Sequence, residues 1–290
     1  MTAPRRLVYL GTPAMAVPPL QALVSAGHHV ALVVTRVDKR RGRGNDLSPS
    51  PVKVAALELG IPVSHQVDDV IATGADLGVV VAFGQLIKPH VLAAVPMVNL
   101  HFSLLPRWRG AAPVERALLA GDTMTGVCLM QLEEGLDTGP VYRRVDVPIA
   151  ATATADGLRH QLVAVGTDLL VDALAGELGT PESQVGETTY AAKLRADELQ
   201  INWSQPAAMI DRLIRLGGAY TTFRGKRLKV HVAELLADAH DAQHAVGDEL
   251  RGAVVGGLRL VRVQPEGKPP MAFGDFANGA RPLPGERLGS

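Results

Sequence analysis

The sequence predicts an α/β fold with a mostly parallel sheet, followed by a small antiparallel β-barrel. Short continuous apolar runs recur through the first half of the 290 residues, and helix-like segments separate them. Such runs are typical of parallel strands that helices cover on both faces. After residue 200 the character changes, because short strand-like runs follow one another closely and turn residues separate them. This second pattern predicts the barrel.

The elements of the first half can be assigned in chain order. Strands are expected at residues 7–10, 29–35, 77–83 and 97–101, and in the runs "IPV", "GVCLMQL" and "PVYRRVDVPI". Helices are expected through "VPPLQALVSAG" and "VKVAALELG" and from about residue 155 to 175. The first strand ends in "GTPAMAV", which lacks the glycine spacing of a dinucleotide-binding turn, and Pro13 removes a backbone N–H.

The second half begins after a stretch that is rich in Gly, Ser, Thr and Pro, residues 176–190, which is typical of a linker. A helix is expected at residues 206–216, and strands in "AYTTF", "LKVHVAEL", "RGAVV" and "LRLVRV". The predicted division is a first domain over residues 1–180, a linker over 181–200 and a second domain over 201–290.

Composition limits the classes of function. Lys and Arg number 29 and so do Asp and Glu, so only local patches could attract nucleic acid. The single cysteine, Cys128, lies in an apolar run and is expected to be buried, so no disulfide framework is possible. The nine histidines lack the close spacing of zinc ligands, and we expect no metal. No apolar run approaches a membrane span, and we expect a cytoplasmic monomer without membrane contact.

The segment "VNLHFSLLPRWRGAAPV", residues 98–114, concentrates polar chemistry at the end of a predicted strand. Asn99 and His101 should share one face of that strand, about 6–7 Å apart along the backbone. An amide and an imidazole placed in this way can both reach one carbonyl oxygen, which suits a reaction that develops an oxyanion. Ser103 is nearby, but no nucleophile-elbow glycines surround it, which disfavours a serine hydrolase.

A carboxylate follows the next apolar run. Asp137 lies in the loop "EEGLDTGP", where Gly135 and Gly139 permit a tight return toward the sheet. An Asp close to His101 would orient the ring and stabilise the imidazolium. Taken alone, an Asp in such a loop usually means a turn, but Asn, His and Asp at the ends of two neighbouring strands predict a catalytic site.

Two stretches are locally basic. Residues 36–53 contain six basic and two acidic residues, a net charge of +4, and their glycines and prolines predict a mobile loop near the site. Residues 193–229 contain eight basic and three acidic residues, a net charge of +5, and could follow a phosphate backbone. A solvated basic loop is the alternative for the first stretch.

Several segments together resemble the methionyl-tRNA formyltransferase family. They are "GTPAMAVPPLQAL", "RGRGNDLSPSPVKVAA", "VVVAFGQLI", "NLHFSLLPRWRGAAPVERALLAGD", "TGVCLMQLEEGLDTG" and "VRVQPEGKPPM". The resemblance covers both halves of the chain, and residues 99–122 are the most specific part. It implies a Rossmann-like formyltransferase domain followed by an OB-like barrel that binds tRNA. It also implies 10-formyltetrahydrofolate as formyl donor and the α-amino group of methionyl initiator tRNA as acceptor.

The resemblance further assigns residues by position. The catalytic residues map to Asn99, His101 and Asp137. Folate contacts map to Ser103, Leu104, Leu105 and Pro106, with Phe83 and Ile87 as a wall of the pterin pocket. The insert that grips the acceptor stem maps to Arg40, Arg41, Arg43 and Lys53, with Arg43 at its centre.

Some positions depart from the family pattern and leave the acceptor open. Phe102 stands where the family usually has Gly, the segment "SHQVDDVIATGAD" is shorter than usual, and a short turn over residues 217–227 replaces a longer aromatic-rich one. The alternatives are a formyltransferase that acts on an amino sugar-nucleotide and a 10-formyltetrahydrofolate hydrolase. A non-catalytic RNA-binding module is disfavoured because all three candidate catalytic residues are present.

Overall fold

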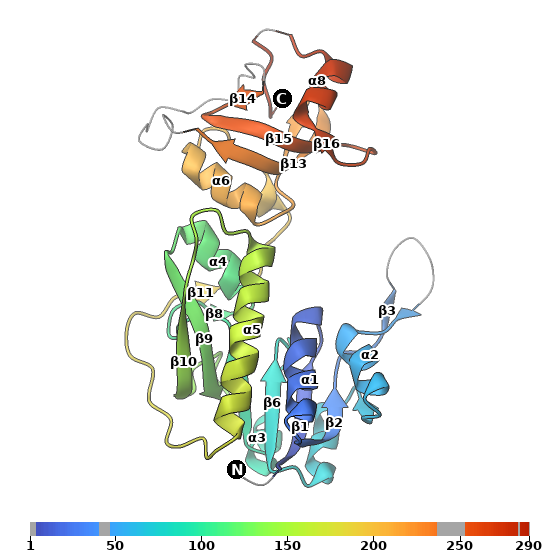
Figure 1. The fold of residues 1–290 in the computed structure, drawn as a ribbon, viewed down its shortest axis with the longest axis vertical. Helices are drawn as coiled ribbons and strands as arrows, with labels where there is room; N and C mark the ends of the chain where they lie inside the picture. Colours follow the sequence, from blue (N-terminus) through green and yellow to red (C-terminus); the bar gives the residue numbers. More distant parts are fainter. Residues whose placement is uncertain (1–3, 41–46, 237–252, 284, 290) are drawn as a thin grey trace. The chain divides into compact units, whose positions relative to one another are not determined.

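The computed structural model describes residues 4–40, 47–236, 253–283 and 285–289. The chain forms two compact units (Figure 1). The first contains Met1–Val114, Met124–Pro148 and Arg159–Ala192, and the second contains Glu115–Thr123, Ile149–Leu158 and Lys193–Ser290. The predicted boundaries at residues 180 and 200 stay predictions.

The first unit is built on a seven-stranded sheet in the order β10-β9-β7-β6-β1-β2-β5. Strands β1, β2, β5, β6 and β7 are parallel, whereas β9 runs antiparallel to both β7 and β10. The predicted mostly parallel sheet is therefore confirmed. The bounds are β1 Arg6–Gly11, β2 His29–Val34, β5 Val63–Ser64, β6 Leu77–Val81, β7 Met97–His101, β9 Met124–Gln131 and β10 Val141–Pro148.

Helices cover both faces of this sheet. They are η1 Ala14–Ala16, α1 Val17–Ser25, α2 Pro51–Glu58, η2 Val67–Thr73, α3 Pro89–Ala94 and α5 Ala155–Leu174, whereas most of α4, Pro113–Ala120, belongs to the second unit. Helices α1 and α5 lie on one face (Figure 1). On that face the α5 residue Gly166 approaches Leu100 of β7 and Val127 of β9, where a Cβ atom would lie 3.1–3.2 Å from their side chains. Helices η2 and α3 pack on the other face, in the cluster that contains Val70, Val91 and Val95.

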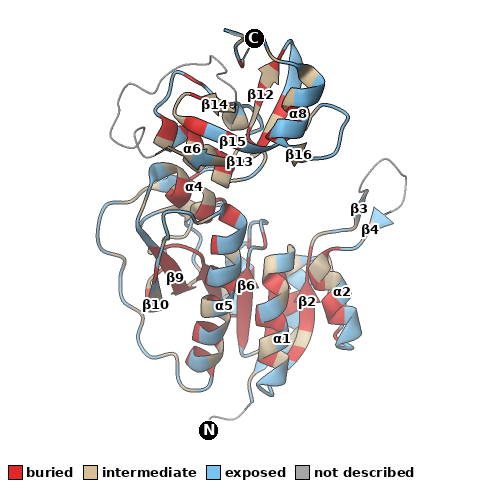
Figure 2. Cartoon of the chain, turned by 45° about the horizontal axis from the view of Figure 1, so that its top comes forward, coloured by how far each residue is buried: buried red, intermediate tan, exposed pale blue. Residues whose placement is uncertain are grey.

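Strands β6 and β7, in the middle of the sheet of the first unit, are completely buried, as their continuous apolar runs predict, whereas the edge strand β10 exposes Arg143, Arg144 and Asp146 (Figure 2). Cys128 is buried beside Leu105, Met130 and Val141, which confirms the expected packing role. Burial also raises the pKa of the Cys128 thiol, which keeps it protonated.

Two short strand pairs accompany the main sheet. Strand β8 Arg109–Gly110 pairs in parallel with β11 Tyr190–Ala191, and β3 Lys39–Arg40 pairs with β4 Leu47–Ser48. The predicted loop over residues 36–53 thus contains a short strand pair, and its last residues already belong to the helix expected through "VKVAALELG". The Ser50 hydroxyl accepts a hydrogen bond from the Lys53 backbone N–H at 3.0 Å, and this cap with Pro51 at the first position starts α2 inside the predicted loop.

The second unit contains a curled antiparallel sheet in the order β12-β13-β15-β14, with β16 beside β15. This barrel-like domain confirms the second part of the fold prediction. The bounds are η3 Asp197–Leu199, α6 Ala207–Arg215, β12 Tyr220–Phe223, β13 Lys226–Leu235, β14 Val254–Val255, β15 Leu258–Pro265, β16 Met271–Ala272 and α8 Phe273–Ala280. The apolar face of α6 joins the barrel core through Ile210 and Ile214, and Phe223 meets Phe276 edge to face at 5.4 Å.

In the part of the chain that the structure describes, no helix is both long enough and apolar enough to cross a membrane.

Candidate functional site

Two polar side chains lie at the end of β7, in the middle of an otherwise apolar sheet. Asn99 and His101 are buried, with only 9% and 5% of their surface exposed. They alternate with Leu100, which faces α5, so both lie on the opposite face together with Met97 of the η2–α3 cluster. Among the described residues, the Asn99 side chain has no hydrogen-bond partner. Its amide is therefore available to a ligand that enters the site.

The loop after β7 fixes the His101 ring. His101 Nε2 lies 3.0 Å from the backbone carbonyl of Trp108, which can only accept, so Nε2 carries a hydrogen. Trp108 adopts a left-handed backbone conformation with φ +63°. The Ser103 hydroxyl closes this loop by donating to the Arg107 carbonyl at 2.6 Å.

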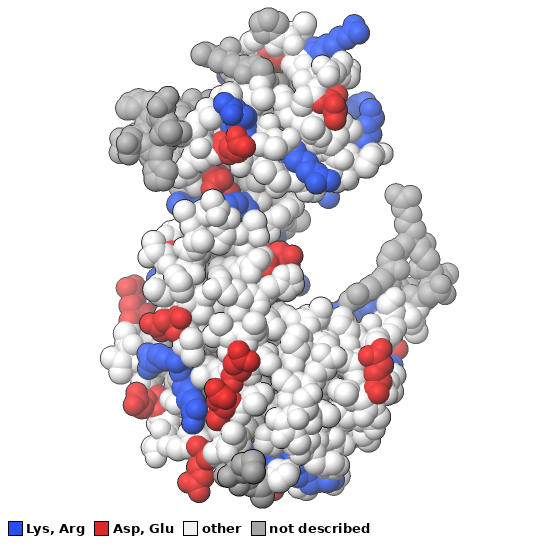
Figure 3. Space-filling view, viewed as in Figure 1, with Lys and Arg blue, Asp and Glu red and all other residues white. Residues whose placement is uncertain are grey.

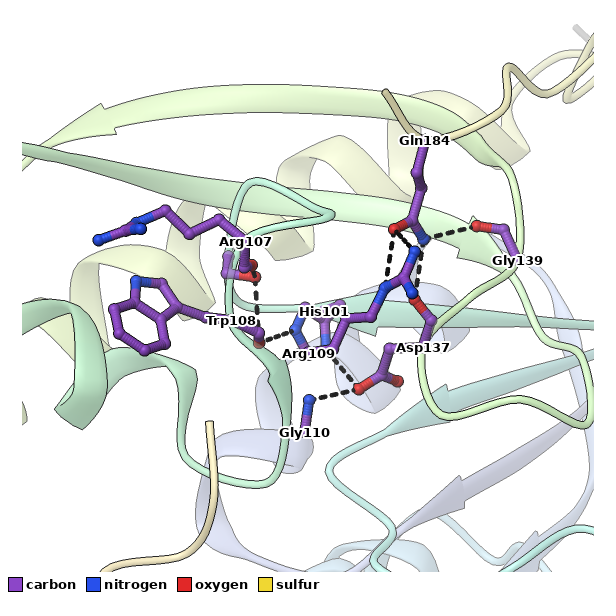
Figure 4. A network of polar contacts seen from close by, with 9 residues as sticks. His101, Arg107, Trp108, Arg109, Gly110, Asp137, Gly139 and Gln184 are labelled. Carbon is purple, nitrogen blue, oxygen red and sulfur yellow. Dashed lines mark hydrogen bonds and ion pairs between the residues drawn. The ribbon is translucent and has the colours of Figure 1, made fainter. Parts of the chain in front are cut away.

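Asp137 reaches the same place by an indirect route. Strand β9 is antiparallel to β7, and its last residue, Gln131, lies beside Val98 rather than at the end where His101 stands. Residues 132–140 therefore fold back over the sheet. They place Asp137 Oδ2 3.6 Å from His101 Nδ1 and 2.7 Å from the Gly110 N–H, which donates to it (Figure 4). Both side chains are largely buried, which strengthens their electrostatic interaction.

Two glycines permit these close approaches. A Cβ atom on Gly139 would lie 2.0 Å from the Gln131 carbonyl oxygen, so only glycine lets the loop turn back against β9. Gly110 has φ +120°, and a Cβ there would lie 2.9 Å from the Ala191 carbonyl. The sequence predicted the role of Gly139, whereas the role of Gly110 was missed.

The structure adds residues that sequence reasoning missed. The Gln184 amide lies between the Arg109 guanidinium and the Asp137 loop (Figure 4). Thr189 accepts a hydrogen bond from the Trp108 N–H at 2.9 Å through its hydroxyl. Both residues belong to the Gly-, Ser- and Thr-rich stretch, where no hydrophobic period marks any position, so the sequence carried no signal for them.

The residues predicted to contact folate are divided between two places. Phe83 and Ile87 are buried in the η2–α3 cluster, on the face of the sheet that carries Asn99. Leu105 and Pro106 are also buried, and Leu104 packs against Gly126. The Ser103 hydroxyl is used within its own loop. Contact of these residues with a folate stays a prediction.

The residues predicted to grip tRNA are only partly described. Arg41 and Arg43 lie outside the described residues, and Arg40 belongs to β3. Lys53 is paired with Asp38, with 2.7 Å between Nζ and Oδ2. Its charge is therefore partly neutralised within the chain.

Several arginines of the second unit are paired with carboxylates of the same unit. Arg195, Arg215 and Arg224 bind the carboxylates of Asp197, Asp211 and Glu286. Figure 3 accordingly shows Lys and Arg mixed with Asp and Glu over the barrel rather than a field of one sign. Within the described part of residues 193–229, Lys193, Lys226, Arg227 and Lys229 pair with no carboxylate, and Arg227 stacks on Tyr220 at 3.7 Å.

No group of three or more His, Cys, Asp and Glu side chains that could hold a metal ion occurs among the described residues. The arrangement that remains is a buried amide, an imidazole of defined tautomer and a carboxylate. It can donate hydrogen bonds to a developing oxyanion and move a proton, so fold and site together define the class as a Rossmann-like group transferase of the acyl-transfer type.

Comparison with known proteins gives the family. The formyl transferase family model matches residues 5–174, and the model of the formyl transferase C-terminal domain matches residues 193–281. The chain therefore belongs to the formyl transferase family.

Individual relatives carry a more specific name. The chain is 43% identical to a methionyl-tRNA formyltransferase of Ruegeria pomeroyi, over 98% of this chain and all of the relative. It is 44% identical to a methionyl-tRNA formyltransferase of Dinoroseobacter shibae, over 91% of this chain and 93% of the relative.

Solved structures support the fold alone, because their sequences are distant. The sugar 3N-formyltransferase WlaRD superposes with a TM-score of 0.63 at 16% identity, covering 93% of this chain and all of that chain. HypX from Aquifex aeolicus, in complex with tetrahydrofolic acid, superposes with a TM-score of 0.62 at 15% identity, covering 95% of this chain and 47% of that chain.

Proposed function

We propose that this protein transfers a formyl group from 10-formyltetrahydrofolate to the α-amino group of methionyl initiator tRNA. The observation that carries the proposal is identity of 43–44% with methionyl-tRNA formyltransferases over nearly the whole chain. That identity covers both units, so the acceptor-binding parts are included as well as the catalytic residues. The likeness to sugar formyltransferases is far weaker, at 16% identity, and concerns the fold.

The site geometry supports a direct transfer in which the amine adds to the formyl carbon. The Asn99 amide donates to the formyl oxygen as it gains negative charge. His101 takes up the amine proton at Nδ1, since Nε2–H is already bound to the Trp108 carbonyl. The resulting imidazolium lies beside Asp137 Oδ2, which stabilises its charge. A proton returned to the leaving folate nitrogen completes the transfer, and no covalent enzyme intermediate is needed.

The folate-binding residues of the proposal are Phe83, Ile87 and residues 103–106. The apolar residues Phe83 and Ile87 belong to the cluster on the Asn99 face of the sheet, which suits the flat pteridine ring of the donor. The buried Ser103 side chain is committed to its own loop, so residues 103–106 would serve through their backbone groups.

The tRNA-binding surface of the proposal combines Arg40, Arg41, Arg43 and Lys53 with the barrel over residues 201–290. On β13, Arg227 and Lys229 alternate with the buried Leu228 and Val230, so they share the outward face of the barrel sheet. Among the described residues these two cations have no carboxylate partner, and they are thus available to phosphate groups.

One experiment separates the three candidate activities. The purified protein is supplied with 10-formyltetrahydrofolate and, in parallel reactions, with charged initiator tRNA, an amino sugar-nucleotide or buffer alone. We expect formyl transfer to the charged tRNA only. Transfer to the sugar nucleotide, or formate release without an acceptor, would replace the proposal with the corresponding alternative.

A salt series with Arg43→Ala tests the predicted acceptor-stem contact. The logarithm of kcat/KM for charged tRNA should fall with the logarithm of salt concentration, with a slope of roughly −0.7 to −0.9 per phosphate contact. Arg43→Ala should lower kcat/KM and make the slope shallower by about one contact, with an unchanged KM for the folate. A slope that is the same in both proteins would remove Arg43 from the tRNA interface.

A further inference from the structure

Gln184 occupies a position between the site and the stretch that follows α5. Its amide nitrogen lies 2.8 Å from each of the carbonyl oxygens of Asp137 and Gly139, to which it donates. Its amide oxygen accepts two hydrogen bonds from the Arg109 guanidinium, at 2.6 and 3.1 Å (Figure 4). Two donors and two acceptor sites are all that a primary amide offers, so the group is fully used.

The groups around the Gln184 side chain require an amide at this position. On one side stand backbone carbonyls, which only accept, and on the other stands a guanidinium, which only donates. A carboxylate would face the two carbonyls with oxygen atoms of its own, and an apolar side chain would bond to neither side. The contacts therefore require glutamine rather than any polar residue of similar size.

These hydrogen bonds form a closed network that links Asp137, Gly110, Arg109 and Gln184. The Gln184 amide donates to the Asp137 backbone carbonyl, and Asp137 Oδ2 accepts from the Gly110 N–H. Arg109, which precedes Gly110 in the chain, donates to the Gln184 amide oxygen. Asp137 has φ +50°, a left-handed conformation that a non-glycine residue keeps only where its surroundings hold it. The hydrogen-bond network holds Asp137 in this conformation, in which its carboxylate faces His101.

Gln184 belongs to residues 182–191, which we call the strap, and backbone hydrogen bonds hold the strap in place both before and after Gln184. Before Gln184, Glu182 and Val141 exchange two backbone hydrogen bonds, at 2.8 and 2.9 Å. After it, the Thr189 carbonyl accepts from the Arg109 N–H at 2.9 Å. Between these points Val185 and Glu187 are exposed, so Gln184 is the inward contact of this part of the strap.

We propose that Gln184 is a positioning residue, which fixes the Asp137 loop over the sheet and thereby holds the Asp137 carboxylate against His101. The inference rests on the proposed function for its kinetic test, but its structural test does not depend on which acceptor is used. It assigns a part in the site to a stretch whose composition alone indicated a linker.

The kinetic test is the variant Gln184→Met, which keeps the side-chain length and removes all four hydrogen bonds. We expect kcat for formyl transfer to fall about 10-fold to 10²-fold, since small displacements of catalytic groups cost up to that amount, with KM values changed less than threefold. In an Asp137→Asn background the same change should add little, because the carboxylate that it positions is gone. Glu187→Met, on the exposed part of the strap, serves as the control and should retain wild-type turnover.

A second measurement follows the His101 ring directly by ¹⁵N NMR of histidine-labelled protein. The signals of His101 should move in Gln184→Met, stay in Glu187→Met, and move no further when Gln184→Met is added to Asp137→Asn. If wild-type protein formylates no acceptor while these shifts occur, the proposed function fails and the positioning role stands. Unmoved His101 signals in a folded Gln184→Met, or an undiminished fall in kcat in the Asp137→Asn background, would overturn the positioning role.

Discussion

The two units use their charged side chains in different ways. Around His101, charged and polar groups bond mainly to backbone atoms of two segments, residues 102–112 and 132–140, and each contact fixes the position of a catalytic candidate. In the barrel unit, arginines such as Arg215 and Arg224 bond to carboxylates and carbonyls of their own unit. Counting charges along a sequence therefore overestimates what a basic stretch offers to a ligand, whereas a short polar motif at a strand end locates a site well.

The largest effects are expected when the side chains of Asn99 and His101, on β7 of the first unit, are removed. Asn99→Ala and His101→Ala should each lower kcat for formyl transfer on the order of 10²–10³-fold, because the first loses the donor to the developing oxyanion and the second loses the group that takes up the amine proton. Thermal unfolding and circular dichroism should show an intact fold. Near-wild-type turnover in either variant would remove that residue from the mechanism.

The corresponding test of the barrel region concerns its unpaired cations. The double variant Arg227→Gln/Lys229→Gln should raise KM for charged tRNA several-fold and flatten the salt slope by roughly 0.7–0.9 for each phosphate that is no longer neutralised. Arg259→Gln is the matched control, because Arg259 lies on the same sheet but pairs with Glu234 at 3.5 Å. Equal KM values for the double variant and wild type would mean that this face of the barrel contacts no phosphate.

The paired arginines should behave in the opposite way. Arg224 bonds to Glu286 and to the carbonyl of Ala280, and its guanidinium lies over the Phe223 ring at 4.8 Å. Arg224→Met should lower the thermal midpoint by a few degrees at most, since exposed ion pairs stabilise little, and leave KM for tRNA unchanged. Lys226→Met, in the same hairpin but without an ion pair among the described residues, should leave the thermal midpoint unchanged. A raised KM for tRNA in folded Arg224→Met would assign this arginine to the interface.

The same contrast explains what the sequence could predict. The β7 motif was predictable because strand alternation alone puts Asn99 and His101 on one face. The flanking glycines allowed us to predict that the loop places Asp137 near the sheet. The antiparallel direction of β9 could not be predicted, because a buried apolar run has the same pattern in either direction. Gln184 could not be found, because it contacts residues that are 45 to 75 positions away in the sequence. The Trp108 carbonyl could not be found, because every residue has a backbone carbonyl and its direction depends on the loop conformation. The pairing of Arg224 with Glu286, 62 positions away, is likewise a tertiary property, whereas the pair of Asp211 with Arg215 follows from helical spacing.

The smallest expected effect is a pH dependence in the barrel unit. Arg116 donates to Glu198 at 2.7 and 3.2 Å, and this pairing, aided by the Arg195 N–H, lowers the pKa of the Glu198 carboxyl to about 2 from its ordinary 4.5. Because the folded pKa lies below the unfolded one, the ionised carboxylate stabilises the fold above about pH 4.5. That contribution is lost as the pH falls toward 2.

Glu198→Gln measures this contribution, since glutamine keeps the shape and cannot ionise. The thermal midpoint of wild type should exceed that of Glu198→Gln by a constant amount from pH 7 to about 5, and the difference should close as the pH falls from 4.5 toward 2. Added salt should reduce the difference at pH 7, because the pair is partly exposed and ions screen it. A difference that stays constant or widens in acid would mean that the charge of Glu198 does not stabilise the fold.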